Sequence, residues 1–328
     1  MRKIFALVLM MLFYLALPSV AFAAENLWSL ASRGTLHQIQ EAIRNGANVN
    51  ARDMGLTPLH EAARSSPYPE VIAALIEAGA DVNARQPVQD LQPLHLATRW
   101  NPNPEITTAL IKGGADVNAV SAYGSPLSIA LTMRGFGGAP IPLEILTALI
   151  KGGADVNAVS YRIGSATPLS EAVGRSNPEL VAIILRAAGS DIDMDVMLHI
   201  AAHSNPHPEV IKIFIEAGAD VNDDTTGQTV LISALNNSNP EVAVTLIEAG
   251  ADVNARTWTH QGRYIGRTVL MEAARVYNSE RMISILLDHG ADPNVRTDDG
   301  RMAIDLAREN EALRNTDALR RLAEASGI

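Results

Sequence analysis

The sequence predicts an all-α repeat solenoid of about eight to nine stacked units, and two observations predict it. The phrase Gly-Ala-Asp-Val-Asn recurs with small variations every 29 to 40 residues, its glycine standing at Gly46, Gly79, Gly114, Gly153, Gly189, Gly218, Gly250 and Gly290. Such a period is typical of one supersecondary unit stacked on copies of itself. Hydrophobic residues make up 47% of the chain but aromatic residues only 4%, so we expect a core of Ala, Leu, Ile and Val between closely packed helices.

The first 23 residues have the pattern of a secretory signal peptide. Arg2 and Lys3 precede an apolar run of 14 residues, 4–17, and Ala21-Phe22-Ala23 resembles a small-residue cleavage site. We expect cleavage after about Ala23 and a periplasmic or secreted protein. The alternative is an uncleaved membrane anchor, but the run is short for a span of about 20 residues. No other segment is apolar enough to predict insertion of the mature chain into a membrane, and the absence of cysteine suits an oxidising compartment.

The unit from Gly55 to Asn83 explains why each repeat forms two helices. Thr57 is a good N-cap, and Pro58 occupies a position where the helix has a spare N–H in any case. Pro69 starts the second helix in the same way, with the acidic Glu70 near the positive end of the helix dipole. The apolar residues fall at helical spacing: Leu59, Ala62 and Ala63 in the first helix, and Val71, Ile72, Leu75 and Ile76 in the second.

These motifs resemble the ankyrin repeat. Thr57-Pro58-Leu59-His60 carries the family's motif intact, and variants begin at Gln92, Ser125, Thr167, Thr229 and Thr268. The resemblance covers roughly residues 25–325 and implies two antiparallel helices per repeat followed by a β-hairpin-like finger. It gives about nine helix pairs, in a repeat domain over 24–328 with an N-terminal capping unit at 24–54, central repeats at 55–300 and a polar C-terminal capping unit at 301–328.

Three departures from the family pattern are expected to change the local structure. Proline-rich links replace the usual tight turn between helices, as at Asn101-Pro102-Asn103-Pro104. The unit 190–218 is short and has Met194-Asp195-Val196-Met197 where a finger belongs, which predicts a stunted finger. The fingers that precede Thr167 and Thr268 are long.

No catalytic constellation is evident, so we expect neither an enzyme nor a bound cofactor. The sequence contains no Gly-x-Ser-x-Gly elbow, phosphate-binding loop or His-Glu-x-x-His motif. The carboxylates recur once per repeat, which indicates turns and helix starts rather than one perturbed catalytic pair. A net charge of −10 argues against a general nucleic-acid interface.

One histidine cluster is a weak candidate for a metal site. His199, His203 and His207 are spaced four apart, and residues four apart share a helix face, so His199 and His203 could bind Zn²⁺ or Cu²⁺. Against this, His199 stands at the histidine position of the family motif, where the resemblance implies local hydrogen bonds. A third convergent ligand is not evident.

The stronger candidate is a surface of arginine and aromatic residues. Aligned repeats place Arg64, Arg99 and Arg275 at one position of the first helix, with Arg175 one place later; we call these four the arginine series. The resemblance puts this end of the helix on the inner face of the stack. Tyr123 belongs to the same surface, and the predicted partner-binding residues are Arg64, Arg99, Trp100, Arg134, Tyr161, Arg162, Arg175, Trp258, Arg263, Tyr264 and Arg275.

The sequence therefore predicts a non-catalytic protein–protein interaction module. It is expected to be a monomer and to bind a protein partner that carries an acidic patch. The short signal and the resemblance of the Asn-Pro-Glu links to bacterial ankyrin proteins favour a bacterial envelope, with delivery to a host cell as an alternative. A different class of function, a small-ligand or metal-handling protein built on His199, His203 and His207, remains open at this point.

Overall fold

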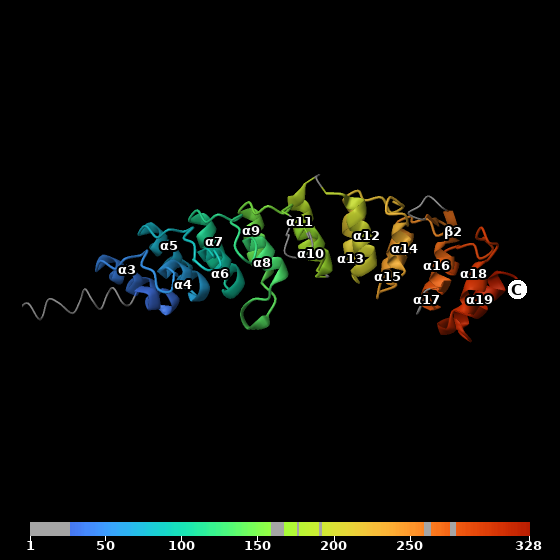
Figure 1. The fold of residues 1–328 in the computed structure, drawn as a ribbon, viewed down its shortest axis with the longest axis horizontal. Coiled ribbons are helices and arrows are strands. Elements are labelled where there is room, and N and C mark those ends of the chain that lie inside the picture. The colour runs from blue at the N-terminus through green and yellow to red at the C-terminus, as the bar shows by residue number, and fades with distance from the viewer. Residues whose placement is uncertain (1–26, 159–166, 176, 190–191, 259–263, 276–279) are drawn as a thin grey trace, which may run out of the picture. The chain divides into compact units, whose positions relative to one another are not determined.

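The computed structural model describes residues 27–158, 167–175, 177–189, 192–258, 264–275 and 280–328 (Figure 1). The expected signal segment 1–23 lies outside these residues. The chain divides into two compact units, Met1–Pro168 and Leu169–Ile328. No helix within the described ranges is long and apolar enough to cross a membrane.

The first unit is a stack of helix pairs. The helices cover residues 27–33, then α3 (Leu36–Arg44), α4 (Pro58–Ser65), α5 (Pro69–Glu77), α6 (Pro93–Trp100), α7 (Pro104–Lys112), α8 (Pro126–Thr132) and α9 (Leu143–Lys151), with the short 3-10 turn η1 (Phe136–Gly138). The first helices of successive pairs pack on one another, α4 on α6 and α6 on α8. The second helices form a parallel row, α3 to α5 to α7 to α9.

The second unit repeats this arrangement. Its elements are α10 (Pro168–Gly174), α11 (Pro178–Ala188), α12 (Met194–Ser204), α13 (Pro208–Glu216), α14 (Val230–Ala234), α15 (Glu241–Glu248), β1 (Arg256–Trp258), β2 (Tyr264–Thr268), α16 (Val269–Arg275), α17 (Glu280–Asp288), α18 (Ala303–Glu309), η3 (Glu311–Leu313) and α19 (Asp317–Ala325). The first helices of its pairs form a row from α12 through α14 and α16 to α18, and we call the row of first helices in each unit the inner row. Over the described residues the helices form nine pairs, which confirms the predicted count.

Helix boundaries follow the local chemistry read from the sequence. Thr57 caps α4 by accepting a hydrogen bond from the backbone N–H of His60, and Pro58 is the first helical residue. Gly79 follows the end of α5 with φ of 91°, a left-handed conformation that favours glycine. The buried core is almost wholly aliphatic, and Phe214 in α13 is the largest fully buried side chain among the described residues.

The fingers vary more than the helices. Two contain single antiparallel bridges, Asp53 with Leu56 and Ser121 with Gly124. The long finger before Thr268 forms the β1–β2 pair, whereas most of the one before Thr167 lies outside the described residues.

The predicted shortening of the finger in this unit is confirmed, because only residues 189–193 separate α11 from α12, but the placement of that finger on Met194–Met197 was wrong. These residues are the first turn of α12, because Asp193 accepts a hydrogen bond from the Val196 N–H at 3.0 Å and so caps a longer helix. The apolar Met194, Val196 and Met197 extend the helix instead of turning away from it.

Asparagines at the ends of the repeated phrase join neighbouring repeats. The Asn50 amide donates to Gly79 O at 2.9 Å and accepts from the Asp81 N–H at 2.9 Å. The same pair of bonds recurs in both units, and we call these residues the finger asparagines: Asn50, Asn83, Asn118, Asn222 and Asn254.

A second set of asparagines joins the repeats at the links between helices. The buried Asn101 donates to both Ala63 O and Ser66 O, at 3.1 and 2.8 Å, and accepts from the Asn103 N–H at 3.0 Å. Asn205 donates to Val173 O in the same way. These link asparagines, Asn101, Asn205, Asn237 and Asn310, satisfy backbone carbonyls at the end of the preceding inner helix.

Candidate functional site

Near the end of α6 in the first unit, an arginine lies between two aromatic rings. Helix α6 buries Leu94 and Ala97 and leaves its last residues, Arg99 and Trp100, half-exposed. The Arg99 guanidinium carbon lies 4.6 Å from the centre of the Trp100 ring and 5.1 Å from that of Tyr123. Both distances are within the range of cation–π attraction.

Two hollows lie beside the end of α6, and Arg99 lines one of them. One, of about 320 Å³, is lined by Leu56, Arg64, Gln86, Gln89, Leu91, His95, Leu96, Arg99, Trp100, Tyr123 and Ile129. The other, of about 640 Å³, is lined by Arg33, Arg64, Ser65, Ser66, Pro67, Trp100, Asn101, Pro102 and Asn103. Because Arg64 and Trp100 line both, the two hollows are neighbours, and we call them together the α6 groove.

The arginine series is not chemically uniform. Arg275 pairs with Glu272 at 2.9 Å, and Arg64 lies 3.7 Å from Glu61. Each of these carboxylates stands three residues before its arginine. The corresponding residue in α6 is Leu96, and among the described residues Arg99 forms no ion pair, while its buried Nε atom has no hydrogen-bond partner. Of Arg64, Arg99 and Arg275, only Arg99 therefore has no carboxylate beside it in the described part of the chain.

Of the other predicted partner-binding residues, those that the structure describes line neither hollow. Arg134 is exposed and donates to Gly138 O at 3.1 Å, and Arg175 follows α10 in the second unit. Trp258 and Tyr264 are paired residues of β1 and β2, which places them opposite each other on the long finger. Tyr161, Arg162 and Arg263 lie outside the described residues.

Several groove residues were missed from the sequence. Gln86 and Gln89 belong to a finger, and Gln89 donates to the Tyr123 hydroxyl at 2.6 Å. Arg33 comes from the first helix, with no motif to mark it. The two glutamines could have been found only by locating the finger against the end of α6, which depends on how neighbouring repeats stack.

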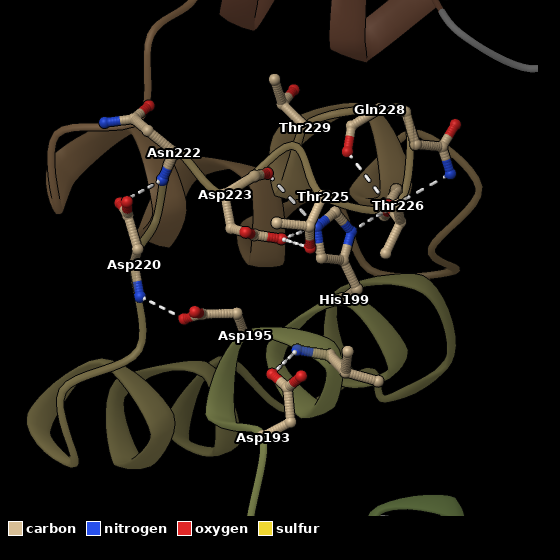
Figure 2. A network of polar contacts seen from close by, with 12 residues as sticks. Asp193, Asp195, His199, Asp220, Asn222, Asp223, Thr225, Thr226, Gln228 and Thr229 are labelled. Carbon is tan, nitrogen blue, oxygen red and sulfur yellow. Dashed lines mark hydrogen bonds and ion pairs between the residues drawn. The ribbon is translucent and has the colours of Figure 1, made fainter. Parts of the chain in front are cut away.

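The histidine cluster does not assemble into a metal site. His199 is buried, and its Nδ1 lies 2.9 Å from Ser233 Oγ while its Nε2 lies 3.1 Å from Asp223 Oδ2 (Figure 2). Both ring nitrogens are therefore engaged, whereas His203 and His207 are exposed. The described residues hold no group of three or more His, Asp or Glu side chains arranged for a metal.

His199, Asp223 and Ser233 are the residue types of a hydrolase triad, but their setting is structural. Ser233 is only 3% exposed and also accepts from Gln228 at 3.3 Å, while Thr225 donates to Asp223 at 2.8 Å. A substrate carbonyl has no access to a hydroxyl buried between helices, so nucleophilic catalysis is not supported. The network instead joins α12 to the finger that precedes α14, through the contact of His199 with Asp223 (Figure 2).

The equivalent histidines of the first unit, His60 and His95, also form hydrogen bonds to the finger of the next repeat. The His60 Nδ1 accepts from the Thr57 N–H at 3.2 Å, so we assign the proton to Nε2, which contacts Leu91 O at 3.1 Å in the next repeat. His95 repeats this arrangement, with Nε2 3.0 Å from Ala119 O. One side chain thus caps its own helix and holds the following finger.

Comparison with known families agrees with this repeat geometry. The model of the ankyrin repeat matches residues 54–86, 90–122 and 265–298, and the model of three consecutive ankyrin repeats matches 169–257. Together these matches cover more than half of the chain. The chain is an ankyrin repeat protein.

Similarity to curated ankyrin repeat proteins is confined to part of their length. The chain is 39% identical over 141 residues to the BTB/POZ domain and ankyrin repeat-containing protein NPR5 of Oryza sativa subsp. japonica, which is 43% of this chain and 20% of that protein. It is 38% identical over 141 residues to the BTB/POZ domain and ankyrin repeat-containing protein NOOT2 of Medicago truncatula, covering 43% and 21%. The chain thus spans about a fifth of the length of these relatives.

We expect the ankyrin repeat protein to lose stability as the pH falls below about 6.5. Burial lowers the pKa of His60 and His95 from the ordinary value of 6.5, so the unfolded chain takes up protons before the folded chain does. The contribution of the two neutral histidines to the free energy of unfolding is complete above pH 6.5 and is lost as the pH falls through the lowered pKa values. For each histidine the free energy of unfolding falls by at most about 1.4 kcal/mol per pH unit.

Urea unfolding between pH 7.5 and 5.5 measures this effect above the range in which ordinary carboxylates titrate. The matched control is His60→Gln with His95→Gln, whose free energy of unfolding is expected to vary less with pH. An equal slope in both proteins would assign the pH dependence to other groups.

Proposed function

We propose that this ankyrin repeat protein is a non-catalytic module that binds a protein partner in the α6 groove. Ankyrin repeats are generally protein–protein interaction modules, so a protein partner is the default for the fold. The observation that supports the groove is the meeting of Arg64, Arg99, Trp100 and Tyr123 at one hollow. Arginine, tryptophan and tyrosine are the residue types that contribute most at protein interfaces.

The binding mechanism is recognition by a preformed surface. The groove walls belong to helices and fingers that are joined between repeats by asparagine and histidine side chains. A surface held in this way loses little conformational entropy on binding, so more of the contact energy appears as affinity.

We further propose that the chain is exported and acts as a monomer in a bacterial periplasm or outside the cell. The support is the basic start, the apolar run 4–17 and Ala21-Phe22-Ala23, together with the absence of cysteine. A small-ligand or metal-handling function is not favoured, because both ring nitrogens of His199 are engaged by Ser233 and Asp223.

Affinity purification with matched variants tests the proposed surface. The chain from Ala24 onward is used to capture partners from envelope and secreted fractions, beside Trp100→Ala and the control Arg275→Glu. A stoichiometric partner that is lost with Trp100→Ala and kept with Arg275→Glu supports the α6 groove. A partner that is retained by Trp100→Ala and lost with Arg275→Glu would move the binding surface to the second unit.

A further inference from the structure

The α6 groove has a chemistry that narrows the partner. Building on the proposed function, we infer that the groove binds an extended acidic segment of the partner, with an Asp or Glu carboxylate on the Arg99 guanidinium and a neighbouring large apolar side chain against Trp100. The inference rests on the state of Arg99, on the charge of the groove and on the side chains that line its two neighbouring hollows.

Arg99 is held in place but not neutralised. Its guanidinium stacks between Trp100 and Tyr123, so its position is fixed without a carboxylate. Equivalent arginines in the same protein are paired, Arg275 with Glu272 and Arg64 with Glu61. The residue three positions before the arginine is a glutamate in α4 and α16, but it is Leu96 in α6. A planar guanidinium that lacks a partner and is already oriented is suited to bidentate binding of a carboxylate.

The groove is positive within an acidic protein. Arg33, Arg64 and Arg99 line it, and neither hollow includes a carboxylate among its lining residues. Glu61 lies behind Arg64 and is buried, so it offsets part of that charge but not the charge of Arg99. The chain as a whole has a net charge of −10. An acidic segment is therefore attracted to this site and repelled elsewhere.

The shape of the groove favours a segment rather than a single small ion. The two hollows share Arg64 and Trp100; Gln86 and Gln89 of the finger line the first, and Pro67 and Pro102 of the helix links line the second. The glutamine amides can bond to the main chain of a bound peptide. The rings of Trp100, Pro67 and Pro102 line the second hollow, and Trp100 also lines the hollow that contains Arg99, which suits a large apolar side chain near the acidic residue.

Selection from a random 12-residue peptide library, displayed on phage and presented to the full chain, tests this inference. We expect the selected peptides to share an Asp or Glu beside a large apolar residue. Arg99→Gln in the protein, or Glu→Gln in the peptide, should weaken binding about tenfold or more. Both changes together should cost little more than either alone, because they remove the same contact.

Two further variants separate a carboxylate contact from a general loss of structure. Leu96→Glu places a carboxylate three residues before Arg99, as in α4 and α16, and should abolish binding of acidic peptides by occupying the arginine internally. The side chains of Glu61 and Glu272 are buried at this position to nearly the same extent as Leu96, so the helix is expected to remain folded. Arg275→Gln is the matched control and should leave the affinity unchanged.

The outcomes distinguish this inference from the proposed function. Peptides without acidic residues that need Trp100 but tolerate Arg99→Gln would overturn the carboxylate contact and leave the groove as the binding surface. Acidic peptides that bind equally well to Leu96→Glu would also overturn it. A library that yields no peptide preferring the wild-type chain over Arg99→Gln counts against the inference in the same way, and a protein partner insensitive to Trp100→Ala counts against the proposed function.

Discussion

Replacing Phe214 with alanine is expected to reduce the free energy of unfolding by about 3 to 5 kcal/mol, the range found when large buried side chains are truncated. Phe214 lies in α13 and is fully buried. Removing its ring leaves a cavity that helices fixed by neighbours on both sides cannot close, since α13 packs against α11 and α15. Denaturant unfolding monitored by circular dichroism provides the measurement.

Phe214→Leu is the matched control for this prediction. The same position, four residues before the glycine of the phrase, is Leu75, Leu110 and Leu246 in other repeats, and each is fully buried. Leucine therefore fits the repeat, and we expect a loss of no more than about 1.5 kcal/mol, as for core swaps of similar shape. Equal losses for the two substitutions would mean that the site does not retain a cavity.

Asn101→Ala is expected to reduce the free energy of unfolding by about 3 kcal/mol, although the residue contributes little apolar surface. Three backbone groups lose their partner at once, the carbonyls of Ala63 and Ser66 and the N–H of Asn103. A buried polar group without a partner costs about 1 to 3 kcal/mol. The same unfolding experiment measures this loss.

Asn118→Ala separates the effect of burial from the number of bonds. Asn118 donates to Gly153 O at 3.0 Å and accepts from Asp155 N at 2.8 Å, but it is exposed, so water can replace its bonds. We expect a loss below about 1 kcal/mol. A loss in Asn118→Ala as large as in Asn101→Ala would contradict the conclusion that burial makes Asn101 the more stabilising of the two.

The helices were predictable because their signals are local. Thr57, Pro58 and Gly79 define helix ends through atoms a few residues away, and the sequence contains all of that information. The finger asparagines were recognised as part of a recurring phrase and Asn101 as part of a proline-rich link, but neither set was recognised as forming hydrogen bonds between repeats. Asn101 contacts carbonyls 35 and 38 residues earlier, which only the stacking of repeats can bring within reach.

The candidate site was predictable in part for the same reason. Aligning repeats placed Arg64 and Arg99 at equivalent positions, and the structure brings both to one groove with Trp100. The differing state of the arginines was also present in the sequence, because Glu272 stands three residues before Arg275 and Leu96 before Arg99. The hydrogen bonds of His199 could not be predicted from the sequence, because its partners Asp223 and Ser233 lie 24 and 34 residues further along the chain.

The link and finger asparagines are neutral amides, so the contacts between repeats are expected to depend less on salt than binding in the groove does. Screening by dissolved ions weakens attraction between charges but has little effect on a hydrogen bond from an amide to a backbone carbonyl. Adding salt should therefore leave the spacing of the repeats intact while it weakens capture at Arg99. Ionic strength becomes a means of releasing whatever is bound without loosening the framework that presents the site.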